Sequence, residues 1–374
     1  MYPYEAIRQV HLELTDKCNA SCPQCPRSDH GGVVNSHLPL TELSLQDVKA
    51  IFSPQFLAQI TNLYACGNYG DPIVARDCLE IFQYFRACNP SIKLGIHTNG
   101  GARSVEFWQG LGPLLPQGKG YVRFGIDGLE DTNHIYRRGV RWNTLMRNVE
   151  AFIGAGGNAE WDYLVFRHNE NQVEQARKIA EDLGFTLFNL KKTGRFLDSK
   201  KMEYIKSTPV KDRNGNVVDR LARPVNPAYQ NQALGALTEL QNRYGSMDRY
   251  LDEATIQCKV QAKGSIYVSA DGYVLPCCWL AAQLHHQAVR TRAEILDPLE
   301  ALGGAGHIDA RRRDIRAIVE DHFFQRLVPG SWSKPSCAQG KLRTCARVCG
   351  HDFKNYEAQS PLNRSPVAAG TRPG

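Results

Sequence analysis

The sequence has no apolar run long enough to cross a membrane, since a spanning helix needs about 20 predominantly apolar residues. Its first residues, MYPYEAIRQ, lack the features of a signal peptide, and no internal repeat is evident. We therefore expect a cytoplasmic protein that does not bind a membrane. Because thiols stay reduced in that compartment, the 12 cysteines indicate metal binding rather than disulfides.

The composition is that of a globular protein. A chain of 374 residues, of which 42% are hydrophobic, can build one large domain and a smaller one. The formal net charge is +7. Basic residues concentrate between Lys191 and Lys211 and in ARRRDIR (310–316), which fits solvated charged faces or surfaces that attract an acidic peptide or RNA.

The densest cysteine run has no fourth member. Cys18, Cys22 and Cys25 form a Cys-x3-Cys-x2-Cys pattern. A four-iron, four-sulfur cluster that only transfers electrons normally takes four thiolates, so three thiolates predict an iron left open for a substrate or cofactor. A zinc knuckle is the alternative, although structural zinc usually takes paired cysteines or Cys/His sets.

Strand-like and helix-like segments alternate in the first half of the chain. Helices are expected at 79–88, 144–156 and 171–184, and strands at 10–14, 60–66, 92–98, 121–127, 161–166 and 185–190. This rhythm predicts an α/β fold, a partial (β/α)6 TIM-like barrel, whose reactive end is the carboxyl end of the strands. The three cysteines follow the first strand and therefore belong to that end.

The same sequence patterns predict the domain organisation. We expect the barrel at 1–196, a polar, irregular linker that covers the open barrel at 197–257, and a small α+β domain at 258–356. The tail at 357–374 is rich in Pro, Gly and Ser and is predicted to be disordered.

The cysteine run together with the βα rhythm resembles the radical S-adenosylmethionine (radical SAM) superfamily. The resemblance implies that SAM binds the open iron and is cleaved reductively to methionine and a 5′-deoxyadenosyl radical, which takes a hydrogen atom from the substrate. It also implies an electron donor such as flavodoxin or ferredoxin.

Four further segments resemble the SAM-binding elements of that family. GNYGDP stands where a Gly-Gly-Glu-Pro element holds the SAM amino group, and HTNGG leaves the third strand. FGIDGLEDTNHIYRRG carries an arginine in the place that pairs with the SAM carboxylate, and VFRHNENQ matches the adenine-binding loop. The residues implied as SAM contacts are Tyr69, Gly70, Asp71, Pro72, Thr98, Asn99, Asp127, Arg137, Val165 and Phe166. Many relatives have an aromatic residue just before the third cysteine, where this chain has Gln24.

The second cysteine set, from Cys258 onward, is similar to the SPASM and twitch domains, which hold auxiliary four-iron clusters. SIYVSADGYVLPCC predicts a β-hairpin turned at Asp271-Gly272. The cysteines are too few for two auxiliary clusters, so the twitch version with one cluster is favoured over complete SPASM. The implied ligands are Cys258, Cys277, Cys345 and Cys349, with Cys337 and then Cys278 as substitutes, and a zinc site is the alternative.

We therefore interpret the chain as a radical SAM enzyme with two four-iron clusters that matures a ribosomally synthesised precursor peptide, by crosslinking, epimerisation or backbone excision. A radical SAM enzyme for a small metabolite or tRNA and a non-catalytic iron–sulfur or zinc scaffold are the alternatives. Only residues 1–17 precede Cys18, so a separate leader-peptide recognition protein or an internal surface is expected to present the peptide.

Overall fold

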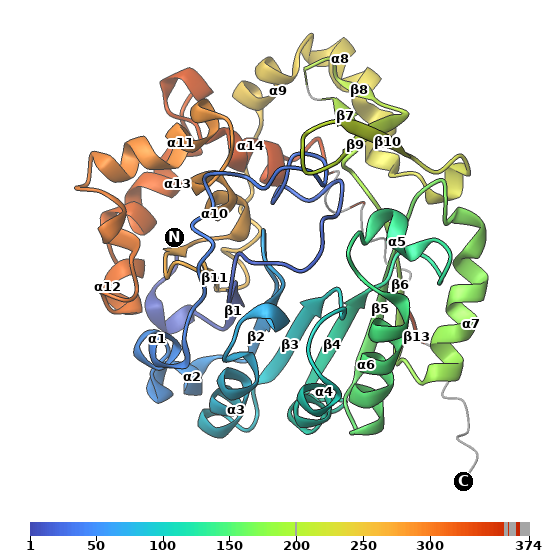
Figure 1. Cartoon of the computed structure of the whole chain (residues 1–374). Helices are drawn as coiled ribbons and strands as arrows, with labels where there is room; N and C mark the ends of the chain where they lie inside the picture. Colours follow the sequence, from blue (N-terminus) through green and yellow to red (C-terminus); the bar gives the residue numbers. More distant parts are fainter. Residues whose placement is uncertain (199, 355–357, 359–363, 367–374) are drawn as a thin grey trace.

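A nine-stranded sheet forms the framework of the molecule in the computed structural model, which describes residues 1–198, 200–354, 358 and 364–366 (Figure 1). The strand order is β12-β11-β1-β2-β3-β4-β5-β6-β13. Strands β11 and β1 to β6 run parallel, and β12 and β13 are antiparallel at the two edges. The bounds are β1 (Gln9–Leu12), β2 (Asn62–Ala65), β3 (Lys93–Thr98), β4 (Gly120–Gly125), β5 (Ala159–Val165), β6 (Leu187–Lys192), β11 (Ser265–Val268), β12 (Val274–Leu275) and β13 (Arg364–Pro366).

Helices connect the parallel strands. Local signals fix several of their ends: Ser44 and Asp47 form a capping box at the start of the first helix, and Gly184 ends the last one with a φ of 84°. The bounds are α1 (Leu45–Ile51), α2 (Pro54–Gln59), α3 (Cys78–Cys88), α4 (Val105–Leu111), α5 (Asn133–Tyr136), α6 (Trp142–Gly154) and α7 (Val173–Leu183). The predicted α/β class is confirmed, with the six predicted parallel strands, of which β1 to β5 are each followed by helices before the next strand.

The two faces of the sheet differ in chemistry because successive strand residues point to opposite sides. One face packs apolar side chains against the helices, for example Trp108 of α4 against Phe124 of β4. The other face carries a row of rings. His11 stacks on Tyr64 with ring centroids 4.5 Å apart, and His97 follows at 5.6 Å from Tyr64. The inner face of the partial barrel is therefore polar and aromatic.

The segment expected to be an irregular linker contains regular elements. They are β7 (Leu197–Asp198), β8 (Glu203–Tyr204), β9 (Ser207–Lys211), β10 (Val217–Ala222), α8 (Leu237–Tyr244) and α9 (Met247–Glu253). These strands and helices are too short to give a clear periodicity in the sequence. Lys211 Nζ donates to Asp29 Oδ2 at 2.6 Å, and Arg138 Nη1 donates to the Lys211 carbonyl at 2.7 Å. The hairpin of β9 and β10 therefore packs on the loop that carries the first cysteines.

The remaining helices follow the predicted hairpin, which turns at Asp271-Gly272 with Gly272 at a φ of 82°. They are α10 (Cys278–Leu284), α11 (Val289–Glu300), α12 (Ile315–Val319), α13 (Val328–Ser331) and α14 (Arg343–Cys349). The hairpin extends the main sheet, since β11 pairs in parallel with β1 and so covers an edge that would otherwise be open. Most of the predicted disordered tail at 357–374 lies outside the described residues, and residues 364–366 of it form β13.

Short helices complete the chain. They are the 3-10 helices η1 (Tyr4–Ala6), η2 (Pro72–Val74), η3 (Gly112–Leu114), η4 (Glu170–Gln172), η5 (Pro227–Tyr229), η6 (Gln232–Ala236), η7 (Ala305–Ile308) and η9 (Cys337–Gln339), and the π-helix η8 (Phe323–Leu327). Across the described part of the chain, no helix combines the length and the apolar character needed to cross a membrane.

Gly70 lies where two loops at the carboxyl ends of β1 and β2 touch. A methyl group at Gly70 would sit 1.7 Å from the Thr15 carbonyl oxygen, closer than any contact that side chains tolerate. We expect Gly70→Ala to lower the free energy of unfolding by about 2 to 3 kcal/mol, because backbone must move to admit the methyl group. Urea unfolding measures the change. Gly154→Ala is the control, since nothing lies within 4 Å of that helical position. Equal losses in both variants would contradict this account.

Candidate functional site

Cys18, Cys22 and Cys25 lie together in the loop between β1 and α1, at the carboxyl end of β1. The Cys25 amide donates to the Cys22 carbonyl at 3.0 Å, which closes a tight turn between these two cysteines. The thiols are near enough to influence one another: Cys22 and Cys25 each help to raise the pKa of Cys18, after burial and the Asp71 carboxylate. The structure therefore brings the three predicted ligands to one place.

Donors surround these sulfur atoms. The Ala20 amide donates to Cys18 Sγ at 3.3 Å, and Asn99 Nδ2 lies 3.8 Å from the same atom. Arg137 Nη1 lies 3.9 Å from Cys22 Sγ. Burial raises the pKa of the Cys22 thiol to about 11, and the Arg137 guanidinium opposes this rise. Positive charge and N–H groups aimed at sulfur favour thiolates, so this donor set fits an iron–sulfur cluster.

Arg137 is held in place by Asp127. Arg137 Nε donates to Asp127 Oδ2 at 2.6 Å, and the Leu164 amide donates to the other carboxylate oxygen at 2.6 Å. A methyl group at Gly125 would lie 2.2 Å from Arg137 Nη2, so only glycine lets the guanidinium lie against β4. Both oxygens of Asp127 are occupied, which makes Asp127 a positioning residue for Arg137.

Asp71 and Asn99 join the loops after β2 and β3. Asp71 Oδ2 accepts from the Asn99 amide at 2.7 Å and from Asn99 Nδ2 at 2.6 Å. Pro72 is buried and begins η2, and Thr98 Oγ1 accepts from the Gly100 amide at 3.0 Å. The Tyr69 ring leaves this region, because its hydroxyl donates to the Ala282 carbonyl of α10 at 2.7 Å. Asn99 and Asp71 thus reach the cysteine loop, whereas the Tyr69 hydroxyl binds α10.

Val165 and Phe166 are fully buried at the end of β5. By strand alternation Val165 shares the helix-facing side with Trp161 and Tyr163. Phe166 packs against Tyr136 with ring centroids 4.5 Å apart and the ring planes tilted by 34°. On the inner face at this level the alternation places Leu164, which sequence reasoning missed. The polar residues Asp162 and Glu160, two and four positions before Leu164, are the sequence signal that identifies the inner face.

Glu13 is a second residue that sequence reasoning missed. Glu13 directly follows β1, where the chain enters the cysteine loop, and it is 3% exposed. Its Oε1 accepts from the amides of Tyr69 at 2.7 Å and Gly70 at 3.1 Å, and its Oε2 accepts from the Tyr267 hydroxyl of β11. Burial raises the pKa of Glu13 to about 7, and these three donors limit the rise. The only signal in the sequence is a glutamate inside the apolar run VHLEL.

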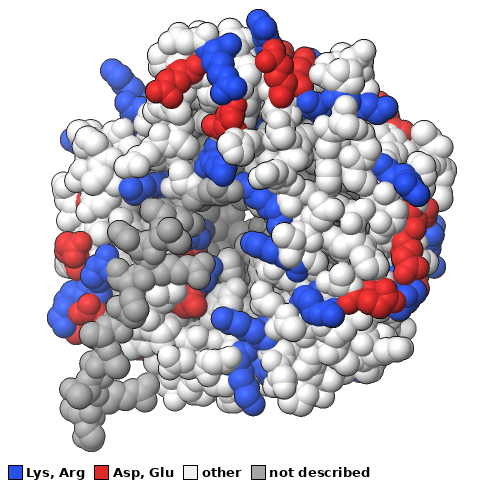
Figure 2. All heavy atoms as spheres, turned by 180° about the vertical axis from the view of Figure 1, so that it is seen from behind, with Lys and Arg blue, Asp and Glu red and all other residues white. Residues whose placement is uncertain are grey.

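A group of charged side chains follows the inner face of β4, β5 and β6. Arg123 pairs with Glu160 and lies 3.4 Å from Asp162, which also pairs with Lys191. Asn189 Nδ2 donates to Asp162 Oδ1 at 3.0 Å. Burial opposes ionisation of Asp162, yet Lys191 and Arg123 hold its pKa below the usual value. Seen from behind, Lys and Arg side chains gather around a hollow in the middle of the molecule (Figure 2).

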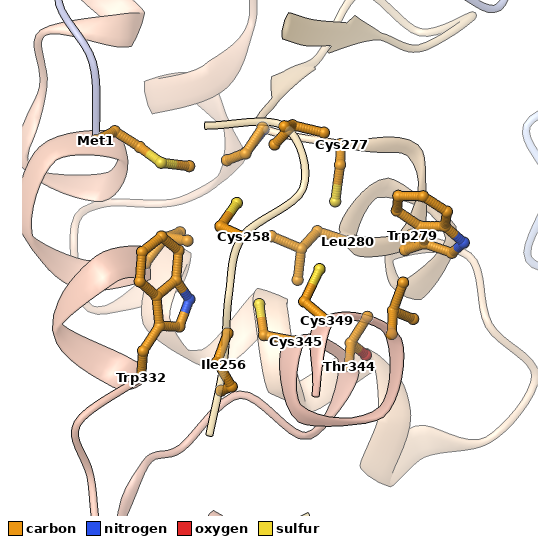
Figure 3. A pocket seen from close by; sticks show the side chains of 14 residues that line it. Met1, Ile256, Cys258, Cys277, Trp279, Leu280, Trp332, Thr344, Cys345 and Cys349 are labelled. Carbon is orange, nitrogen blue, oxygen red and sulfur yellow. The ribbon is translucent and has the colours of Figure 1, made fainter. Parts of the chain in front are cut away.

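Cys258, Cys277, Cys345 and Cys349 point their sulfur atoms into one pocket (Figure 3). Cys345 and Cys349 come from successive turns of α14, and Cys277 caps the start of α10. Burial raises the pKa of Cys277 to about 12, while the backbone amides of Leu280 and Trp279 favour its thiolate. The nearby Trp332 indole also favours the thiolate of Cys345, although burial raises the pKa of this thiol well above its usual value. This donor set also fits a cluster held by thiolates.

The two substitute cysteines lie elsewhere. Cys337 borders a different groove, and its amide donates to Asp252 Oδ1 at 2.7 Å. Cys278 is half-buried beside Cys277 and also interacts with Cys66 and Glu13. Within the described ranges, no group of three or more His, Cys, Asp or Glu side chains is arranged to hold a single metal ion. A four-iron cluster is wider than one ion and takes ligands that lie further apart.

Comparisons with known proteins agree with the geometry. No protein-family model matches the chain. Among curated proteins it is similar to GTP 3',8-cyclases, one from Saccharophagus degradans (23% identical over 154 residues, 40% of this chain and 43% of that one). Another, from Staphylococcus epidermidis, is 20% identical over 171 residues, 45% of this chain and 48% of that one. The chain therefore spans less than half the length of these relatives.

Solved structures cover more of the chain. Streptococcus suis SuiB bound to S-adenosylmethionine has a TM-score of 0.54 at 12% identity, covering 92% of this chain and 73% of that one. SuiB bound to its precursor peptide SuiA gives 0.52 at 13% identity, covering 92% and 72%. AdoMet-bound native anSMEcpe gives 0.51 at 15% identity, covering 96% and 93%.

The fold is that of the radical SAM enzymes, and the resemblance drawn from the cysteine run is confirmed at this level.

The raised pKa of Glu13 predicts that the free energy of unfolding depends on pH. Its pKa is raised from 4.5 to about 7 in the folded chain, so its stabilising contribution is full below pH 4.5 and is lost as the pH rises through about 7. This loss amounts to about 3 kcal/mol. Glu13→Gln removes the titration, and urea unfolding at a series of pH values should show a flatter profile than wild type between those limits. Glu239→Gln, an exposed position on α8, should keep the wild-type profile. An unchanged slope in Glu13→Gln would contradict the assignment.

Proposed function

We propose that the chain is a radical SAM enzyme with an auxiliary cluster, and that it modifies a peptide made on the ribosome. The observation that carries the first part is the convergence of Cys18, Cys22 and Cys25 with Arg137 at the carboxyl ends of the strands. With a bound four-iron cluster, that site supplies one electron to SAM, whose cleavage yields a radical able to take a hydrogen atom from a substrate. The electron donor is proposed to be a flavodoxin or a ferredoxin.

The residues of this chain orient SAM through charge and backbone. Arg137 is a cation available to a carboxylate, because Asp127 binds its Nε and Cys22 Sγ lies near Nη1, which leaves Nη2 for another partner. The loop of Tyr69 to Pro72 presents its backbone beside the cysteines, fixed by Glu13 on one side and by Asn99 on the other. Among the apolar side chains of β5, Leu164 rather than Val165 is placed to cover the nucleoside from the inner face.

The second cysteine set supports an auxiliary cluster with four protein ligands. Cys258, Cys277, Cys345 and Cys349 share one pocket, and backbone amides favour the thiolates of Cys258 and Cys277. A cluster held by these four thiolates would have no open iron, so it would order the substrate pocket or accept an electron rather than bind substrate. A single set of four ligands supports the twitch version, with one auxiliary cluster, over complete SPASM.

A peptide substrate is supported by SuiB, which has this fold and whose structure includes its precursor peptide SuiA. The similarity to GTP 3',8-cyclases favours a second candidate, a radical SAM enzyme that acts on a nucleotide or another small metabolite. Substrate turnover separates the two: the proposal requires modified peptide when the enzyme is supplied with a precursor encoded beside it.

The SAM site is tested by incubating the anaerobically prepared enzyme with dithionite and SAM and measuring 5′-deoxyadenosine. The triple change of Cys18, Cys22 and Cys25 to Ala should abolish the product. Arg137→Ala should weaken SAM binding by about 1.5 to 3 kcal/mol, because a charge-assisted bond to the carboxylate is lost. Arg141→Ala, a nearby exposed arginine, should bind SAM normally. Unchanged SAM affinity in a folded Arg137→Ala protein would show that Arg137 does not contact SAM.

The auxiliary site is tested by iron content and product. The reconstituted enzyme should hold about eight irons per chain, and Cys258→Ala with Cys277→Ala should hold about four. That double variant should still form 5′-deoxyadenosine but no modified peptide, because all proposed SAM contacts come from the first half of the chain. Cys337→Ala is the matched control and should keep both clusters, since this thiol lies outside the pocket. Stoichiometric zinc in place of the second cluster would overturn the assignment.

A further inference from the structure

A second, larger groove lies between α9, α11 and α14 on the outside of the C-terminal half. Its volume is about 1220 Å³, above the range of about 300 to 1000 Å³ that is typical of small-molecule pockets. The groove is separate from the loops that hold Cys18, Cys22 and Cys25. Its size suits a length of polypeptide better than a single metabolite.

The groove is strongly basic. Seven Lys or Arg residues border it, against three Asp or Glu residues. Within the described residues, five of these cations have no carboxylate partner: Lys200, Arg290, Arg326, Lys334 and Arg347. Arg347 also has its Nε buried without any hydrogen-bond partner among the same residues. A buried guanidinium N–H that the described residues leave unsatisfied favours a ligand that carries acceptors.

The carboxylates of the groove are already engaged by the protein. Asp248 pairs with Arg343 across the groove. Glu294 of α11 accepts from the Thr344 amide at 2.7 Å and from its hydroxyl at 2.8 Å, which caps the first turn of α14. Only Asp297, which is exposed, has no partner among the described residues. The protein's own carboxylates therefore neutralise only a small part of the positive charge that lines the groove.

The lining favours an acidic peptide over RNA. His322 is the one aromatic ring among the described residues around the groove, and none of them is Phe, Tyr or Trp. Sites for single-stranded nucleic acid stack bases on such rings. Arginines, in contrast, match carboxylates with paired hydrogen bonds. The same helix serves both sites, because α14 carries Arg343 and Arg347 toward the groove and Cys345 and Cys349 toward the four-cysteine pocket.

We infer that this groove binds an acidic segment of the peptide substrate, apart from the residues that react. This inference rests on the proposed peptide substrate. It gives the chain an internal recognition surface, so that a separate leader-binding protein is not required for capture. Docking along α14 tethers the rest of the peptide near the auxiliary cysteines and raises its effective concentration at the barrel.

The probe is a fluorescein-labelled synthetic peptide of alternating Glu and Ser, titrated with the full-length, reconstituted enzyme and followed by fluorescence anisotropy. We expect saturable binding that weakens as salt is raised. Arg290→Glu with Arg326→Glu should weaken binding by about tenfold or more. Lys119→Glu with Arg147→Glu makes the same change in net charge at exposed positions far from the groove and should leave the affinity unchanged.

Two further probes test the specificity of binding. The same peptide with Gln in place of Glu should not bind, and a labelled oligouridylate should bind more weakly than the acidic peptide. Absent peptide binding, tighter binding of the oligouridylate, or equal losses in the two double variants would overturn the inference. In each case 5′-deoxyadenosine formation by the same protein reports separately on the proposed radical chemistry. If the enzyme still cleaves SAM but does not bind the peptide, the proposed radical chemistry is retained and the groove is rejected as a peptide-binding site.

Discussion

Glu13 is the buried carboxylate on which the arrangement of both cysteine sites depends. It stands at the end of β1 and accepts hydrogen bonds from the loop that follows β2 and from Tyr267 of β11. Asn68 extends the same connection, since its side chain donates to the Cys278 carbonyl at 2.8 Å. A buried donor left without a partner costs about 1 to 3 kcal/mol, so loss of this carboxylate affects several groups at once. The loop proposed to hold SAM and the start of α10, beside Cys277, thus share one support.

The strands, the main crossover helices and the position of the first cysteines could be predicted because they are written in local patterns. Each βα unit repeats the same periodicities, and Cys18, Cys22 and Cys25 lie within eight residues of one another. The partners of Glu13 could not be predicted, since Tyr267 is 254 residues away and nothing in either segment specifies the other. The attachment of β11 to β1 escaped prediction for the same reason.

The placement of individual side chains was harder still. The apolar pair Val165 and Phe166 matches the motif, yet strand alternation turns Val165 toward the helices and leaves Leu164 on the inner face. The short hairpins of residues 197–222 give no periodic signal, because two to six residues per strand are too few. The cysteines of the second set were easier, since α14 fixes Cys345 and Cys349 one turn apart and the predicted hairpin delivers Cys277.

The pairing of β1 with β11 has a consequence for synthesis of the chain. β1 is complete when residue 12 has been made, but its outer neighbour begins only at residue 265. Until then the first strand of the sheet presents an unpaired edge, which is the kind of surface that associates with other chains. A nascent chain that stalls before residue 265 therefore carries an exposed edge next to its thiol-rich loop. Folding of the first half is in this way coupled to completion of the second.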